Sequence, residues 1–128
     1  MEYLKTELKN TIVKKTIQKN NKNYQYLKII LIGSFQNINY FSFEEFIKNE
    51  LSPISNDYNI IIFELSKLNY INSLGISCLI ELIENLYEKQ YKVFILNLPS
   101  HLKRILYFLE FQNKSIIIHQ EEDFIEYL

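Results

Sequence analysis

The chain has 128 residues, 48% hydrophobic and 23% charged, and its 14 Lys and Arg nearly balance its 15 Asp and Glu. This length fits one domain with a sizeable core, and the formal charge of -1 disfavours a dedicated binder of nucleic acid or of anionic membranes. The single cysteine excludes an internal disulfide framework and a cysteine-rich zinc site, and the two glycines exclude a P-loop and a dinucleotide-binding fingerprint.

The first expected elements form a hairpin. Residues 11–18 are predicted to pair with the following strand, although Tyr3, Leu4, Leu8 and Ile12 also match one face of a short helix. The polar run 19–23 is typical of a turn, and residues 26–32 are rich in β-branched side chains and stop at Gly33. We therefore expect a central strand there and leave residues 1–10 open, as an extension or as the start of the first strand.

The middle of the chain alternates helix and strand patterns. A capping box of Ser42 and Glu45, followed by helical apolar spacing up to Pro53, predicts a helix. Residues 59–65 are nearly all apolar, as in a strand covered on both faces. Residues 73–88 place an apolar stripe opposite a polar face, which predicts an amphipathic helix.

The same alternation continues to the C-terminus. Residues 93–96 are expected to form a short buried strand, and Pro99 is expected to open a helix. Residues 115–119 predict a last strand and residues 121–128 a short final helix. The repeated order predicts an α/β fold, a single domain over residues 11–128 with a mixed, mainly parallel β-sheet and helices packed against it.

The most informative stretch is residues 68–77, which follows a buried strand and opens the amphipathic helix with Asn72, Ser73, Leu74 and Gly75. It resembles the signature of the STAS domain, the fold of anti-sigma-factor antagonists. In that family a buried strand and an aromatic or apolar residue lead into Asp-Ser-Ser-Gly or Asp-Ser-Thr-Gly and an apolar helix. The resemblance covers about residues 24–128, including the helix start at 99–106 and the turn at 109–111.

The resemblance implies a phosphorylation site at Ser73. It implies a serine-kinase anti-sigma factor as the partner and modifying enzyme, and a PP2C-type phosphatase that reverses the modification. A hydroxyl at a helix N-terminus suits this role physically, because unpaired N–H groups there favour an anion and phosphorylation adds about -1.5 to -2 charges. The expected partner-binding residues are Asn72, Ser73, Leu74, Gly75, Ile76, Ser77, Ser34 and Phe35.

Two departures from the family pattern, and the general preference for Ser at helix starts, leave other interpretations open. Asn72 stands where the family has Asp, and Leu74 replaces its second Ser or Thr. In one alternative, Ser73 is only the N-cap of its helix, for which Ser is favoured. In another, the chain is a STAS module that is never phosphorylated and acts as a scaffold or a transporter-associated subunit.

An enzyme built on Ser73 ranks last among these alternatives. The nucleophile elbow Gly-x-Ser-x-Gly is absent, and His101 and His119 do not form a metal-spaced pair. We therefore expect a non-enzymatic protein with no catalytic residues, no metal and no cofactor, and leave a homodimer open. The charged N-terminus and strand-sized apolar runs predict a cytoplasmic protein without direct membrane insertion, since a bilayer span needs about 20 apolar residues.

Overall fold

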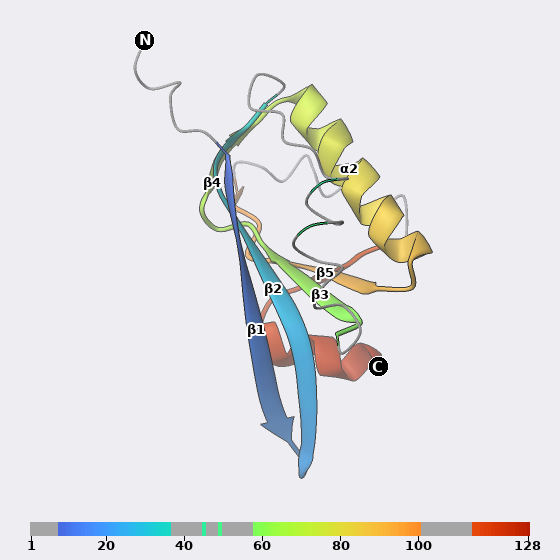
Figure 1. Cartoon of the computed structure of the whole chain (residues 1–128). Helices are drawn as coiled ribbons and strands as arrows, with labels where there is room; N and C mark the ends of the chain where they lie inside the picture. Colours follow the sequence, from blue (N-terminus) through green and yellow to red (C-terminus); the bar gives the residue numbers. More distant parts are fainter. Residues whose placement is uncertain (1–7, 37–44, 46–48, 50–57, 101–113) are drawn as a thin grey trace.

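Six strands form one mixed sheet in the computed structural model, which describes residues 8–36, 45, 49, 58–100 and 114–128 (Figure 1). The strands follow the order β1-β2-β3-β5-β6, and β4 pairs with β2 off this path. Only β1 and β2 are antiparallel, which confirms the predicted α/β fold with a mainly parallel sheet. In chain order the elements are β1 (Lys9–Lys19), β2 (Lys22–Phe35), β3 (Ile60–Glu64), β4 (Leu68–Ile71), α2 (Ser73–Glu88), β5 (Lys92–Leu96), β6 (Ile116–Ile118) and the 3₁₀ helix η6 (Glu121–Tyr127).

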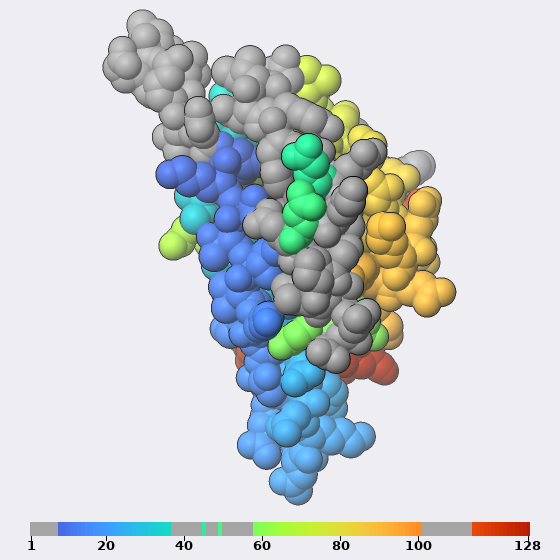
Figure 2. All heavy atoms as spheres, viewed as in Figure 1, coloured from blue at the N-terminus to red at the C-terminus, as the bar shows by residue number. Residues whose placement is uncertain are grey.

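The predicted hairpin is confirmed, and the helical reading of Ile12 is wrong. Ile12 pairs with Ile29 of β2 and packs against the main core cluster, so tertiary pairing decides its conformation. Asn20 and Asn21, with φ of 53° and 64°, make the tight turn that matches the twist of the two strands. β3 pairs only with residues 27–30 of β2, so the far half of the hairpin projects beyond the sheet (Figures 1 and 2).

β2 does not stop at Gly33, as the sequence predicts, but continues to Phe35. Gly33 has a φ of 103°, and the pairing of β2 with β4 shifts register between Gly33 and Ser34. A positive φ at an irregular pairing suits glycine, so this residue forms a bulge instead of ending the strand. Strand β4, which sequence reasoning missed, pairs with the part of β2 beyond this bulge.

The remaining predicted elements agree with the structure where it describes them. Helix α2 has the predicted bounds, and the strands expected at 59–65, 93–96 and 115–119 correspond to β3, β5 and β6. The final helix is present as η6. The helices predicted from Ser42 to Pro53 and from Pro99 onward lie almost wholly outside the described residues. Within the described ranges, no helix combines the length and apolar character needed to cross a bilayer.

The two faces of the sheet bury two separate clusters of side chains. Alternation along the strands sends Leu27, Ile61 and Val93 to the face covered by α2, and Tyr26, Ile62 and Phe94 to the face covered by η6. The first cluster is wholly apolar and includes four helix residues, namely Leu79, Leu82, Ile83 and Leu86. The second cluster is smaller, and Phe124 is the residue that η6 contributes to it.

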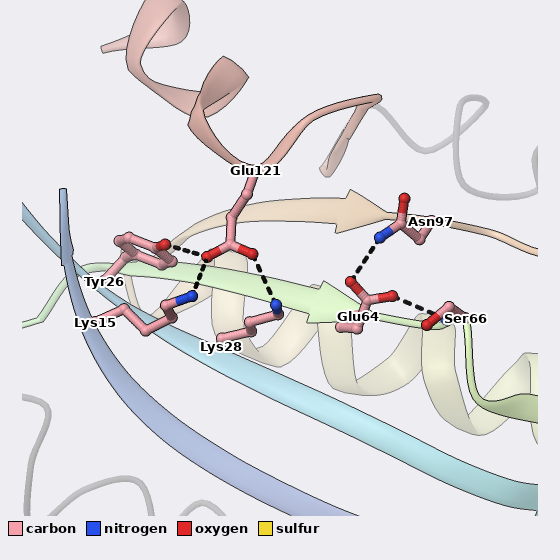
Figure 3. A network of polar contacts seen from close by, with 7 residues as sticks. All are labelled: Lys15, Tyr26, Lys28, Glu64, Ser66, Asn97 and Glu121. Carbon is pink, nitrogen blue, oxygen red and sulfur yellow. Dashed lines mark hydrogen bonds and ion pairs between the residues drawn. The ribbon is translucent and has the colours of Figure 1, made fainter. Parts of the chain in front are cut away.

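Charged groups also fix η6 to the sheet (Figure 3). The carboxylate of Glu121 accepts hydrogen bonds from the Tyr26 hydroxyl and, at 2.7 Å, from Lys28 Nζ, and it lies 2.9 Å from Lys15 Nζ. Burial alone would raise the pKa of Glu121, but the hydrogen bonds from Lys28, Tyr26 and Lys15 outweigh it and lower that pKa to about 2. Burial, and then the bond to Glu121, raises the pKa of the Tyr26 hydroxyl above its usual range.

Candidate functional site

Asn72, not Ser73, caps helix α2, so the reading of Ser73 as the N-cap is wrong. The Asn72 side-chain oxygen accepts a hydrogen bond from the Gly75 N–H at 2.8 Å, three residues on, as an N-cap residue does. The Asn72 N–H donates to the Phe35 carbonyl at 3.2 Å, which ties the cap to the end of β2. Ser73 is therefore the first helical residue, one position inside the cap.

The first turn of α2 presents an exposed hydroxyl beside unpaired backbone donors. Ser73 is exposed, and no described residue forms a hydrogen bond with its side chain. The N–H groups of Ser73 and Leu74 have no acceptor among the described residues, and the first turn contains no acidic side chain. No described residue thus compensates the positive end of the helix dipole there, which favours an anion at this position.

Exposed apolar side chains precede and follow Ser73 in the chain. Leu74 is 52% exposed and Tyr70, on β4, is 50% exposed, both among the most exposed large apolar side chains of the described residues. Ser77 is exposed one turn further along α2, whereas Asn72 and Ile76 are half-buried. Ser73, Leu74 and Ser77 of the predicted partner-binding residues therefore lie together on an accessible surface.

Three other predicted partner-binding residues, Ser34, Phe35 and Gly75, are buried beneath this surface. Phe35 is 1% exposed and Ser34 is 6% exposed, and Gly75 is buried as well. A Cβ on Gly75 would overlap the Phe35 carbonyl oxygen and lie 2.8 Å from Cγ1 of Ile71. Glycine is required here because the helix start packs directly on the end of β2. These three residues shape the site from below and do not themselves present a contact surface.

Sequence reasoning missed Glu64, a buried carboxylate that holds the turn leading to this site (Figure 3). Its oxygens accept hydrogen bonds from the Ser66 N–H at 3.0 Å and from Asn97 Nδ2 at 2.8 Å. Ser66 belongs to the turn that joins β3 to β4, and β4 leads directly into α2. The available signal was one acidic residue inside an otherwise apolar run, a position where a carboxylate needs hydrogen-bond partners.

Cys78 is not a reactive group in this region. It is half-buried on α2 and packs against the main apolar cluster. Burial raises the pKa of its thiol, and the nearby Glu81 carboxylate adds to the effect. A thiol with a raised pKa stays protonated at neutral pH and is a poor nucleophile. The chemistry of the site is therefore that of an exposed hydroxyl in a protein surface.

Comparisons with known proteins agree with this geometry at the level of family and fold. The family model of the STAS domain matches residues 2–124. A search of curated proteins finds no match.

Among solved structures, an uncharacterised protein from Shewanella loihica with a SpoIIAA-like fold has a TM-score of 0.58 at 10% identity, covering 93% of this chain and 94% of that one. A proposed anti-sigma factor antagonist from Thermotoga maritima has a TM-score of 0.59 at 12% identity, covering 88% of this chain and 92% of that one. The Bacillus cell fate determinant SpoIIAA in its phosphorylated form has a TM-score of 0.53 at 14% identity, covering 91% of this chain and 97% of that one. At these identities the three structures show a shared fold.

Proposed function

The chain belongs to the STAS domain family, and from this premise we propose that it is a non-enzymatic, cytoplasmic regulator that binds a serine-kinase anti-sigma factor and is switched by phosphorylation at Ser73. One observation carries the proposal. Ser73 exposes its hydroxyl at the first position of α2, beside N–H groups that no described residue pairs, and it lies between the exposed Tyr70 and Leu74 in the chain.

The switch follows from two properties of this surface. Without phosphate, Leu74 and Tyr70 offer apolar area to a partner packed over the helix start, and Ser73 adds no charge that the interface must desolvate. Phosphorylation adds about -1.5 to -2 charges and considerable bulk, which the helix N-terminus tolerates but a close-packed partner does not. The partner is released without refolding of the domain, and a PP2C-type phosphatase restores the binding form.

A kinase assay tests the modification. The purified chain is incubated with ATP and each serine-kinase anti-sigma factor encoded in the source genome, and phosphate is located by peptide mass spectrometry. We expect a single phosphate on Ser73 and none on Ser73→Ala, while Ser77→Ala, which changes another exposed hydroxyl of α2, is modified like the wild type. If none of these kinases modifies the wild type, or if Ser73→Ala is modified equally, the phosphorylation proposal is wrong.

Calorimetric titration with the same kinases tests the contact surface. Leu74→Ala is expected to weaken binding about tenfold, because truncating a central apolar anchor typically costs more than 1 kcal/mol. Glu88→Ala, an exposed change at the far end of α2, is the control and leaves affinity unchanged. Equal affinities of the Leu74→Ala variant and the wild type would place the interface elsewhere.

A second candidate function is a STAS module that is never phosphorylated, serving as a scaffold or a transporter-associated subunit. It is favoured by Asn72, whose amide caps the helix but carries no charge, and by Leu74, which offers apolar area at a position where the family has a hydroxyl. Affinity purification from cells separates the two functions. Recovery of a kinase and a phosphatase supports the switch, and recovery of transporter or scaffold subunits supports the module.

A further inference from the structure

We propose that a pocket at the opposite end of α2 binds a small aromatic carboxylate. The pocket has a volume of about 210 Å³ and lies where the end of α2, the amino ends of β5 and β6, and the end of η6 meet. Ligand pockets for drug-sized molecules measure about 300–1,000 Å³, so this one suits a single flat ring system. Among the described residues, its lining includes Tyr87, Lys92, Lys114, Ser115 and Tyr127.

The charge of the lining indicates an anionic ligand. Two lysines, Lys92 and Lys114, line the pocket, and none of the described residues that line it is acidic. Lys114 contacts Glu84 only at 3.6 Å, a long and partly exposed ion pair of the kind that contributes little. No ion pair involves Lys92 within the described ranges. Both ammonium groups can therefore turn toward a carboxylate without breaking a strong contact.

The aromatic part of the lining indicates a flat ligand. Tyr87 and Tyr127 are each 50% exposed, so both keep ring surface that the core does not use. Tyr127 is held by Phe94, with ring centroids 6.0 Å apart, and the Lys114 ammonium lies 5.9 Å from the centroid of the Tyr87 ring. A ligand ring stacked on these tyrosines would place its carboxylate beside a cation already located over an aromatic face.

A serine side chain in the pocket wall favours a ligand that accepts hydrogen bonds. Ser115 lines the pocket, and its Oγ is buried without a hydrogen-bond partner among the described residues. A buried hydroxyl left unpaired destabilises the fold, and rotation about χ1 toward an acceptor in the pocket relieves that cost. A carboxylate oxygen is such an acceptor, so the hydroxyl and the two ammonium groups all favour a carboxylate ligand.

The C-terminus of α2 does not oppose an anion strongly, although helix dipoles place negative charge there. The N–H groups of Lys89, Gln90 and Tyr91 donate to the carbonyls of Asn85, Leu86 and Tyr87, which close the last turn. Tyr87 also lies 14 residues from Ser73 along the helix, about 21 Å at 1.5 Å per residue. The pocket is thus separate from the proposed phosphorylation site and does not depend on it.

The test is a titration of the ¹⁵N-labelled chain with 1-naphthoate, followed by NMR. Cyclohexanecarboxylate probes charge without an aromatic ring, and 1-naphthalenemethanol probes the ring without charge. We expect saturable shifts of the amides at positions 87, 91–93, 114–116 and 127 with 1-naphthoate, and at least about fivefold weaker binding of the other two probes.

Matched variants separate the pocket from nonspecific binding. Lys114→Gln and Ser115→Ala are each expected to weaken 1-naphthoate binding about three- to fivefold. Lys89→Gln removes a charge at the same end of α2, outside the lining, and leaves binding unchanged. The proposal is overturned by the absence of saturable shifts at these amides, by equal binding of cyclohexanecarboxylate or 1-naphthalenemethanol, or by equal losses in Lys114→Gln and Lys89→Gln.

Discussion

Among the described elements, α2 and η6 cover the two faces of the sheet, and they are held in different ways. Helix α2 has 16 residues, five of them buried, and four of these five belong to a cluster of fifteen buried residues that contains no ionisable group. Helix η6 has seven residues, of which Phe124 is buried, and depends on the ion pairs of Glu121 as well. The comparison indicates that α2 is part of the cooperative core, whereas η6 is attached at a few points and can be released by itself.

The largest effect is expected from Leu86→Ala in α2. Leu86 is fully buried, so the truncation leaves a cavity in the main cluster and lowers the free energy of unfolding by about 2–5 kcal/mol. Urea unfolding followed by far-UV circular dichroism measures the loss. The same titration of Tyr87→Ala, the exposed next residue, serves as the control and should shift little. Comparable losses in both variants would contradict a cooperative core under α2.

Phe124→Ala is expected to cost about 3 kcal/mol, at the low end for a buried Phe, because η6 can detach before the sheet unfolds. Phe124 contacts the rings of Tyr24, Tyr26 and Phe94, with centroids 4.8 to 6.3 Å away. Hydrogen exchange measured by NMR should show faster exchange of the η6 and β6 amides and unchanged protection in α2. Loss of protection throughout the sheet would mean that both faces belong to one cooperative unit.

Glu121→Gln tests the charged attachment through its pH dependence. The pKa of Glu121 is about 2, below its ordinary value of 4.5, so its contribution is complete above pH 4.5 and is lost as the pH falls toward 2. We expect the wild type to lose about 2 kcal/mol more than the variant between pH 5 and pH 2, measured by urea unfolding at each pH.

Glu126→Gln is the matched control for this experiment. Glu126 lies on the same helix but is exposed, so its removal should leave the acid dependence of the wild type intact. If acid lowers the unfolding free energy of the wild type no more than that of Glu121→Gln, the ion pairs of Glu121 do not stabilise η6.

The smallest expected effect is at the start of α2. Asn72→Ala removes the N-cap and should lower the free energy of unfolding by about 1 kcal/mol. Asn72→Asp keeps the capping oxygen and adds a charge at the positive end of the helix, so it should match or exceed the wild type by about 0.3–1 kcal/mol at pH 7. Urea unfolding of both variants checks the order. An Asn72→Ala variant as stable as wild type would show that the cap contributes nothing.

Periodicity predicted the elements that form from local pattern and burial. The bounds of α2 followed from its apolar stripe, and β3 and β5 followed from short runs buried on both faces. Strand β4 was missed because only its two end residues, Leu68 and Ile71, are buried, and because its partner is a segment of β2 more than thirty residues away. No local pattern carries that pairing.

At the site, too, local features were predictable from the sequence and contacts between distant segments were not. The position of Ser73 at a helix start followed from sequence, but Asn and Ser are both good caps, and the link from Asn72 to Phe35 is what places the cap one residue earlier. The sequence predicts that the strand ends at Gly33, because a glycine that forms a bulge with positive φ cannot be told from one that ends a strand by sequence alone. The Tyr and Lys pocket brings together four elements, and only the fold makes them neighbours.

The lysines of the first hairpin also bear on solubility. In the described sheet, β1 is an outer strand of 11 residues, and such a strand offers a row of free backbone groups to other chains. Residues 8–36 carry six Lys and no Asp or Glu, and Lys19 faces Lys22 across the tip. Two copies meeting edge to edge along β1 would bring rows of like charge together. The arrangement costs the hairpin a little stability and guards the chain against fibre-like assembly.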